Sequence, residues 1–423
     1  MAPHAWVVVD LGFGDAGKGS ITDFLVRDQS AGLVVRFNGG AQAGHNVITP
    51  DGRHHTFSQF GSGSFVAGTK TLLGPDFLLH PWGMLIESEH LERAGVTDIW
   101  QRTAIDGRCR LITPYQQATN RIREQLRGAN AHGTCGIGIG ECAADSLDHP
   151  HDTLRAQDLH DPKTLRSKLV MQRRRKRAAL VTMHGASTLS DFRIFDDNDM
   201  IDHIVDVWSS IAAQMWITTP QQSHALITDT PRVVFEGAQG VLLDEDHGFH
   251  PHTTWSHCTA KGAMDLIDDR AVTRLGLTRG VTVRHGAGPL PTHRADLTAA
   301  LPEPHNENDG WQGQFRVGDL DLVLLRYALA VCGDIDGLVM THLDRLSTPV
   351  QVCTQYADGT TALPVGLPGD LNHNAALCQQ LFFAQPTLTP TSDPIATVEA
   401  GTGCPVLLTS HGPAAGDKRW RHR

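Results

Sequence analysis

The 423-residue sequence lacks features that mark several classes of protein. Its eight cysteines include no C-x-x-C pair, and their scatter is typical of reduced thiols in a cytoplasmic protein. No apolar run reaches the about 18 residues that a membrane-spanning helix needs. The amino-terminal MAPHAWVVVD has no basic segment followed by a long apolar one, so we expect no signal peptide. These absences favour a soluble, cytoplasmic protein without a membrane partner.

An excess of positive charge is also missing. The 36 Lys and Arg residues stand against 46 Asp and Glu residues, and the formal net charge is −10 with histidine neutral. This balance argues against a nucleic-acid partner bound through overall charge. The basic run KLVMQRRRKRAAL, residues 168–180, is therefore interpreted as a solvated helix face. Local sites for small phosphorylated ligands remain open.

The residues that are present indicate an α/β enzyme. Hydrophobic residues make up 40% of the chain, and there are 42 glycines. Short apolar, β-branched runs alternate with helix-like stretches, which predicts a mostly parallel central sheet flanked by helices. The expected strands are Val7–Val9, Leu33–Phe37, Arg232–Phe235, Gly280–Val283, Leu338–Thr341 and Val406–Thr409.

We expect one large α/β domain over residues 1–423. The stretch from about 106 to 187 is interpreted as a helical insertion. The Pro/Asn/Gly-rich stretch from about 301 to 318 is interpreted as a flexible substrate loop, because long loops are often functional.

The segment GFGDAGKG, Gly12 to Gly19, is the first candidate site. An apolar strand precedes it and a helix-like stretch follows, as in a phosphate-binding loop of the form G-x-x-x-x-G-K-[ST]. Backbone N–H groups, a helix N-terminus and Lys18 together make an anion cradle. Gly19 replaces the Ser or Thr that normally holds Mg²⁺, and Asp15 adds a negative charge inside the loop.

Four further segments carry glycines, histidines or acids after expected strands. They are VVRFNGGAQAGHNV with His45, VVFEGAQGVLLDEDHG, HGAGPLPTH and LVMTHLDRL. In the last, an aspartate can accept hydrogen bonds from the two donors of a guanine edge, which adenine does not offer. The spacing of Asp244, Asp246 and His247 fits no standard zinc pattern, and we expect no metal there.

Taken together, these segments resemble the adenylosuccinate synthetase family in sequence and order. GDAGKG, GGAQAGH, FEGAQG, LLDEDHG, GAGPLPT and HLD are far more specific together than any one alone. The resemblance runs from Trp6 to about Asp344 and returns at LLTSHGP, residues 407–413. It implies a P-loop-variant α/β fold and an enzyme that is usually a homodimer. Such an enzyme uses GTP to join IMP and L-aspartate, giving adenylosuccinate, GDP and phosphate.

The resemblance also implies catalytic roles. The purine 6-oxygen is first phosphorylated, and the amine then displaces the phosphate, which is a better leaving group than oxide. Asp15 would take the N1 proton and bind Mg²⁺, with the Gly44 carbonyl as a second ligand. His45 would be a general acid at the γ-phosphate, and Lys18 would balance charge on the transferring group.

The remaining site residues are implied in the same way. The GTP site would comprise Gly14, Gly17, Lys18, Gly19, Asp344, Ser410, Gly412 and Pro413, with Asp344 as the guanine reader. The nucleotide and amino acid substrates would contact Gln42, Thr134, Gln239, Thr254 and Arg316.

Most departures from the family pattern lie at the two substrate ends, and the glycine-rich loop itself has Ala16 and Ser20 where the family has GDEGKGK. At the monophosphate end, Ala41-Gln42 replaces His-Asn, Cys135 replaces a threonine and Ile137 replaces an arginine. His149 stands where the family sends an arginine across the dimer.

At the amine-donor end, the family holds the two aspartate carboxylates with an arginine-rich loop. The corresponding segment, residues 305–321, retains only Arg316, with Trp311 and Phe315 nearby. His293 replaces an acid, and His342 replaces the lysine of the guanine motif.

Three interpretations follow from this pattern. The chain is a diverged synthetase with compensating residues, or a specialised ligase with another oxo-substrate or amine donor, for instance in secondary metabolism. The third is a GTP-binding regulator without catalysis. Retention of both Asp15 and His45 counts against the third, because binding alone needs neither.

Overall fold

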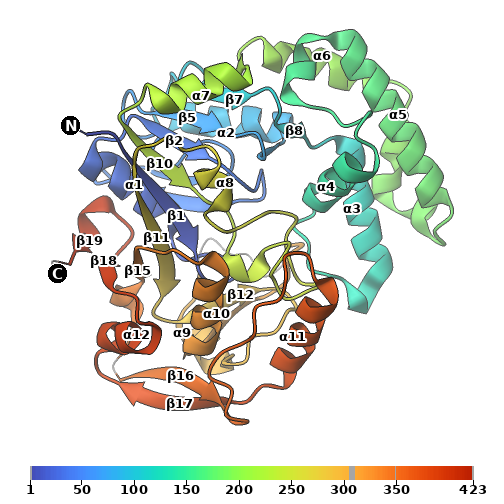
Figure 1. The fold of residues 1–423 in the computed structure, drawn as a ribbon. Helices are drawn as coiled ribbons and strands as arrows, with labels where there is room; N and C mark the ends of the chain where they lie inside the picture. The colour runs from blue at the N-terminus through green and yellow to red at the C-terminus, as the bar shows by residue number, and fades with distance from the viewer. Residues whose placement is uncertain (1, 304–309, 348, 422–423) are drawn as a thin grey trace.

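The computed structural model describes residues 2–303, 310–347 and 349–421. Within these ranges, ten strands form a central sheet (Figure 1). From edge to edge they are β19 (Lys418–Trp420), β18 (Val406–Ser410), β15 (Gly337–Thr341), β11 (Ala271–Arg279), β1 (His4–Asp10), β10 (Arg232–Glu236), β2 (Leu33–Arg36), β5 (Lys70–Leu73), β7 (Thr103–Asp106) and β9 (Trp216–Thr218). Among the described strands of this central sheet, only β18 and β19 pair antiparallel. The predicted mostly parallel sheet is confirmed.

The middle strands are apolar on both faces because both faces are buried. Along β1, Val7 and Val9 pack into one hydrophobic cluster. Val8, between them, packs into a second cluster with Ile21 and Leu25 of helix α1. Successive side chains of a strand point to opposite faces, so this alternation places a core on each side of the sheet.

The connections supply the helices. They are α1 (Lys18–Gln29), α2 (Pro81–Arg93), α3 (Pro114–Arg127), α4 (Ile139–Asp148), α5 (Pro162–Val181), α6 (Met200–Ala212), α7 (Pro220–Thr228), α8 (Lys261–Met264), α9 (Ala295–Ala300), α10 (Leu322–Cys332), α11 (Leu371–Phe383) and α12 (Pro394–Thr402). Local signals start several of them: Thr113 and Gln116 form a capping box at α3, and Asp161 caps α5 before a proline. In the part of the chain described here, no helix is long and apolar enough to cross a membrane.

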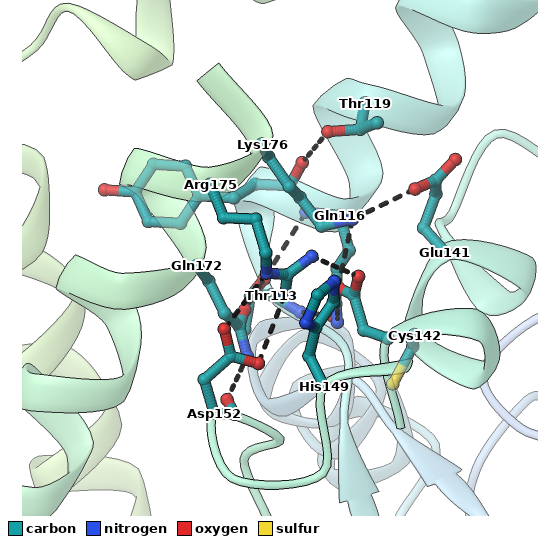
Figure 2. A network of polar contacts seen from close by, with 12 residues as sticks. Thr113, Gln116, Thr119, Glu141, Cys142, His149, Asp152, Gln172, Arg175 and Lys176 are labelled. Atoms are coloured by element: carbon teal, nitrogen blue, oxygen red, sulfur yellow. Dashed lines mark hydrogen bonds and ion pairs between the residues drawn. The ribbon is translucent and has the colours of Figure 1, made fainter. Parts of the chain in front are cut away.

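Helices α3, α4, α5 and α6 gather at one side of the molecule, beyond the β7 end of the sheet (Figure 1). A buried polar network joins α3, α4 and α5 (Figure 2). Lys176 Nζ lies 3.0 Å from both Glu141 Oε2 and Asp145 Oδ2. Arg175 pairs with Asp145 at 2.7 Å and with Asp152 at 3.1 Å. These pairs fix the position of α4 and of the turn that follows it.

Smaller sheets surround the central one. β3 (His45–Ile48) pairs with β4 (His54–Phe57), and β6 (Leu78–Leu79) pairs with β8 (Arg110–Leu111). β14 (Leu320–Asp321), β16 (Val350–Tyr356) and β17 (Pro386–Thr391) form a third sheet. This third sheet lies with α11 and α12 at the end of the molecule built by the last third of the chain (Figure 1).

One expected strand does not belong to the central sheet. In place of Gly280–Val283, the central strand is β11, which ends at Arg279, and β12 (Thr282–His285) pairs antiparallel with β13 (Phe315–Gly318). β11 was missed because its arginines and threonines interrupt the apolar pattern. The chain turns at Gly280, where a Cβ would lie 2.4 Å from Leu346.

The expected loop at 301–318 ends in an ordered strand, since β13 covers residues 315–318. Residues 304–309 of that loop lie outside the described residues. The single-domain boundary at 1–423 and the substrate role of this loop stay predictions.

Candidate active site

The glycine-rich turn between β1 and α1 is tightly packed. Gly14 and Gly17 have φ angles of 100° and 86°, a backbone conformation that favours glycine. A Cβ on Gly19 would lie 2.8 Å from Cβ of His45. Residue 19 therefore has no room for the Ser or Thr of an ordinary phosphate-binding loop, and its replacement brings His45 close to the start of α1.

Asp10, the last residue of β1, holds this turn together. Its carboxylate accepts the backbone N–H groups of Gly12 and Ala16, each at 2.9 Å. It also pairs with Lys18 Nζ at 2.8 Å, and both side chains of the pair are buried. Sequence reasoning missed Asp10, although a buried acid at the end of an apolar strand is a visible signal. The ammonium of Lys18 is thus fixed at the turn.

Asp15 lies in this turn with a φ of 60°. Its carboxylate is 3.2 Å from Nε2 of His285, at the end of β12. Burial acts to raise the pKa of Asp15, but the hydrogen bond and charge of His285, with the charges of Lys18 and Arg279, lower it overall. An ionised carboxylate results, which can accept a proton or bind a hard cation such as Mg²⁺. His285 lies within a segment that the sequence singled out, but its contact with Asp15 was not predicted.

His45 begins β3 and is buried. Its Nδ1 lies 2.6 Å from Oε1 of Glu236, the last residue of β10. Glu236 also accepts the N–H of Ser62 at 3.0 Å, and Arg36 lies 4.0 Å away. Burial acts to raise the pKa of Glu236, but Arg36 and His45 outweigh it and lower that pKa.

The imidazole of His45 is neutral at pH 7. Burial lowers its pKa to about 4, despite the opposing effect of Glu236. Because ionised Glu236 can only accept, the Nδ1 atom of neutral His45 carries the proton. A phosphate anion beside this ring would favour its protonated form, which the predicted role of general acid requires.

Two glutamines present unpartnered amide atoms inside the molecule. Both amide atoms of Gln42 and the Oε1 atom of Gln239 are buried without a hydrogen-bond partner. Gln239 has a φ of 56° and packs against Gly39, where a Cβ would lie 2.9 Å from Oε1. Buried amides without partners are costly, so a polar ligand at these atoms would relieve a real penalty. The predicted substrate roles of Gln42 and Gln239 fit this environment.

Two arginines face each other across the β12–β13 pair. Arg284 is the register partner of Arg316, and burial together with the charge of Arg316 lowers the pKa of Arg284 to about 9. Arg284 lies over the ring of Phe13 at 4.1 Å. Arg316 donates to the carbonyls of Gly286 and Gly288. Sequence reasoning predicted Arg316 and missed Arg284, which lies just before GAGPLPT.

The guanine motifs meet at the ends of neighbouring strands. Asp344 follows β15 in the turn Leu343–Arg345, and Ser410 ends β18, which pairs with β15. Ser410 Oγ lies 3.2 Å from the Gly412 carbonyl, which also accepts from Lys418 Nζ at 2.9 Å. Pro413 follows Gly412 on this loop. The structure therefore brings these predicted GTP residues to one edge of the sheet.

The remaining predicted residues have structural contacts of their own. Thr134 Oγ1 lies 3.1 Å from Asn120, and its N–H donates to Glu124 at 3.2 Å. The Thr254 N–H donates to the Leu243 carbonyl at 2.8 Å. His149, which ends α4, has an exposed side chain.

A possible cation group lies elsewhere. Ligand atoms of Asp244, Asp246 and His257 lie within 4.8 Å of one another. The Asp244 carboxylate already accepts the backbone N–H groups of Asp246, His247 and Cys258. We therefore assign Asp244 a structural role in folding this loop.

The sheet and its first turn place the protein in the class of α/β enzymes that bind a nucleotide at the carboxyl ends of parallel strands. The model of the adenylosuccinate synthetase family matches residues 7–382. The chain therefore belongs to the adenylosuccinate synthetase family, and it is a GTP-dependent ligase that forms a C–N bond.

Curated relatives and solved structures agree with this assignment. The adenylosuccinate synthetase of Clostridium beijerinckii is 30% identical over 385 residues, covering 89% of this chain and 86% of the relative. That of Salinibacter ruber is 35% identical over 373 residues, covering 84% and 81%. The fully ligated Plasmodium falciparum enzyme has the same fold, with a TM-score of 0.78, 20% identity and 99% coverage of both chains.

A cyanophage succinoaminodeoxyadenylate synthetase, solved with dGMP and dATP, is more distant. Its TM-score is 0.58 at 16% identity, with 99% of this chain and 96% of the other covered. The family and the fold predicted from the sequence are thus confirmed, while the individual site residues stay predictions.

Proposed function

We propose that this chain phosphorylates the 6-oxo group of IMP or a related oxo-purine with GTP. The amine of aspartate or an analogue then displaces the phosphate, and GDP and phosphate are released. The observation that carries this proposal is the meeting of Asp15 and His45 at one turn. Asp15 lies in the turn itself, and His45 packs against Gly19 at its end.

Asp15 is suited to act on the purine that accepts the phosphoryl group, and His45 is suited to act on the phosphoryl group itself. An ionised Asp15 can take the proton from the ring nitrogen beside the oxo group, which makes that oxygen a better nucleophile. His45, once protonated beside the phosphates, can donate to the group being transferred. Lys18 and backbone N–H groups at the start of α1 can stabilise its negative charge.

A magnesium ion fits the same turn. The Asp15 carboxylate is a hard, anionic oxygen ligand with a lowered pKa, and the Gly44 carbonyl precedes His45 on the neighbouring segment. A bound Mg²⁺ would neutralise phosphate charge during transfer. Asp15 thereby replaces the missing hydroxyl at residue 19 as a possible ligand.

Arg284 and Arg316 support an anionic amine donor. Their guanidinium groups are like charges on opposing strands, and both Nε atoms are buried without hydrogen-bond partners. Such an arrangement is unfavourable unless an anion relieves it. A carboxylate of an amino acid donor is suited to this role.

The proposal is tested by measuring phosphate release from GTP with IMP and L-aspartate, and then with a panel of oxo-purines and amino acids. We expect release that requires both substrates and a new C–N-linked product by mass spectrometry. Reactions lacking either substrate serve as controls. Tight GTP binding without turnover for any pair would favour the regulator instead.

A further inference from the structure

The turn Gly133–Gly140, which leads from α3 into the first residues of α4, lies beside two segments that carry proposed catalytic residues. On one side, a Cβ on Gly133 would lie 3.8 Å from the Cα of Gly286, the residue after the His285 partner of Asp15. On the other side, Ile137 shares a hydrophobic cluster with Ala41, on the segment that leads to His45. This segment therefore lies close to the loops that would face a substrate bound at Asp15.

The surroundings of the turn are apolar. Ala41, Cys135 and Ile137 pack together around a buried cluster of aliphatic and cysteine side chains. Trp311 packs against Gly136, where a Cβ would lie 2.6 Å from the indole, and Trp255 packs against Gly140 at 2.9 Å. The two indoles remain 39% and 45% exposed. We call Ala41, Cys135, Ile137, Trp255 and Trp311 the apolar corner.

The guanidinium of Arg121, at this corner, already has partners within the protein. Arg121 Nε donates to the Gly136 carbonyl at 2.9 Å. The same group lies 5.7 Å from the centre of the Trp311 ring, and Nη1 lies 3.7 Å from Asp191. Binding a phosphate dianion calls for cationic side chains that are free to form charge-assisted hydrogen bonds. Arg121 would have to give up its present contacts to do so.

A cleft of about 280 Å³ opens beside Ala41 and Ile137. No lysine or arginine of the described chain lines it, and its larger polar side chains are those of His55, Gln59, His80, Glu87, His90 and Gln117. The Nε2 atom of buried His55 has no hydrogen-bond partner, and it lies 3.6 Å from the Glu87 carboxylate. These side chains offer hydrogen-bond partners to hydroxyl groups, and the Glu87 carboxylate disfavours a phosphate dianion beside it.

We propose that the oxo-substrate of this enzyme carries no phosphate at the apolar corner. The end of the substrate that lies there is uncharged and bears hydroxyl groups, as in a nucleoside. This inference rests on the proposed function, since it names the class of oxo-substrate for that same site.

The test compares inosine with IMP in the full-length enzyme, using GTP and one amine donor for both. We expect kcat/KM for inosine to exceed that for IMP by roughly tenfold, because the phosphate of IMP would lose its hydration at the apolar corner without gaining a cationic partner. Ile137→Arg places a cation at the corner and is expected to raise kcat/KM for IMP by a similar factor. Ile137→Gln, of similar size but uncharged, is the matched control and should not.

Other results have distinct meanings. A kcat/KM for IMP equal to or above that for inosine overturns this inference and leaves the proposed function standing. A selective loss of activity with IMP in Arg121→Gln overturns it as well, because Arg121 would then serve a phosphate. If neither substrate is turned over, the proposed function fails. Calorimetric binding of inosine against IMP then decides this inference separately, with tighter IMP binding overturning it.

Discussion

At the scale of single residues, the acid at position 15 compensates for the hydroxyl that is missing at Gly19. An ordinary phosphate-binding loop carries a hydroxyl after its lysine, but at residue 19 a side chain would collide with His45. The carboxylate of Asp15, in the same turn, offers an oxygen in its place. Because the pKa of Asp15 is lowered, this oxygen is anionic at neutral pH. The glycine at residue 19 thus leaves room for His45, and the acid at residue 15 adds an anionic oxygen to the same turn.

Replacement of Asp15 by asparagine tests this role. Asp15→Asn removes the base and the anionic ligand while keeping the size of the side chain. We expect kcat for phosphate release to fall by at least about 10²–10⁴-fold, the range for loss of general base catalysis. Circular dichroism and thermal unfolding should match the parent protein. A near-normal rate would refute the assigned role.

At the scale of elements, helix α2 begins with an unusual cap. The Nδ1 atom of His80 accepts the N–H of Gly83 at 2.9 Å, and Pro81 follows it at the first helical position. Burial is the main reason that the pKa of His80 is lowered to about 4. Only the neutral ring can accept at Nδ1, so the start of α2 depends on His80 staying unprotonated.

This cap predicts a loss of stability in acid. The unfolded chain takes up a proton at His80 near pH 6.5, whereas the folded chain does so near pH 4. The neutral ring of His80 therefore contributes fully to the free energy of unfolding above pH 6.5. That contribution falls by about 3 kcal/mol as the pH is lowered from 6.5 towards 4. His80→Asn retains a capping oxygen and cannot titrate. We expect its free energy of unfolding, from urea titrations, to fall less steeply between pH 6.5 and 4.

Exposed His151 supplies the control for this experiment. His151→Asn should leave the pH dependence of unfolding as in the parent protein. Parallel profiles for His80→Asn and the parent would contradict the capping account. His80→Ala, which removes the cap at every pH, should cost about 1 kcal/mol at pH 7.

At the scale of the whole molecule, we predict a homodimer, as the family resemblance implies. Each chain has a mass of 45.9 kDa, so light scattering should give twice that value. His149 lies exposed at the end of α4, where a partner subunit can approach it. A monomer that is fully active at nanomolar concentration would contradict both the dimer and any role of His149 across it.

The order of strands and helices was largely predictable, because each element has its own local pattern of apolar and polar residues. Val7–Val9, Leu33–Phe37 and Val406–Thr409 were expected as strands, and each overlaps a strand of the central sheet. β11 was not predicted, since its polar residues hide the pattern of a buried strand. The helices around residues 114–181 were recognisable by composition, but their packing through Lys176 and Arg175 was not (Figure 2).

The sequence by itself determined the family, because six short motifs follow one another in the order of that family and each can be recognised without its distant partners. Only the tertiary structure decided which partners surround His45 and Asp15 and thereby set their pKa values. The partners of His45 and Asp15 are Glu236 and His285, which lie 191 and about 270 positions away along the chain. Such contacts follow from the order of strands in the sheet, which local spacing does not encode. The same is true of the apolar corner, where four separate segments meet.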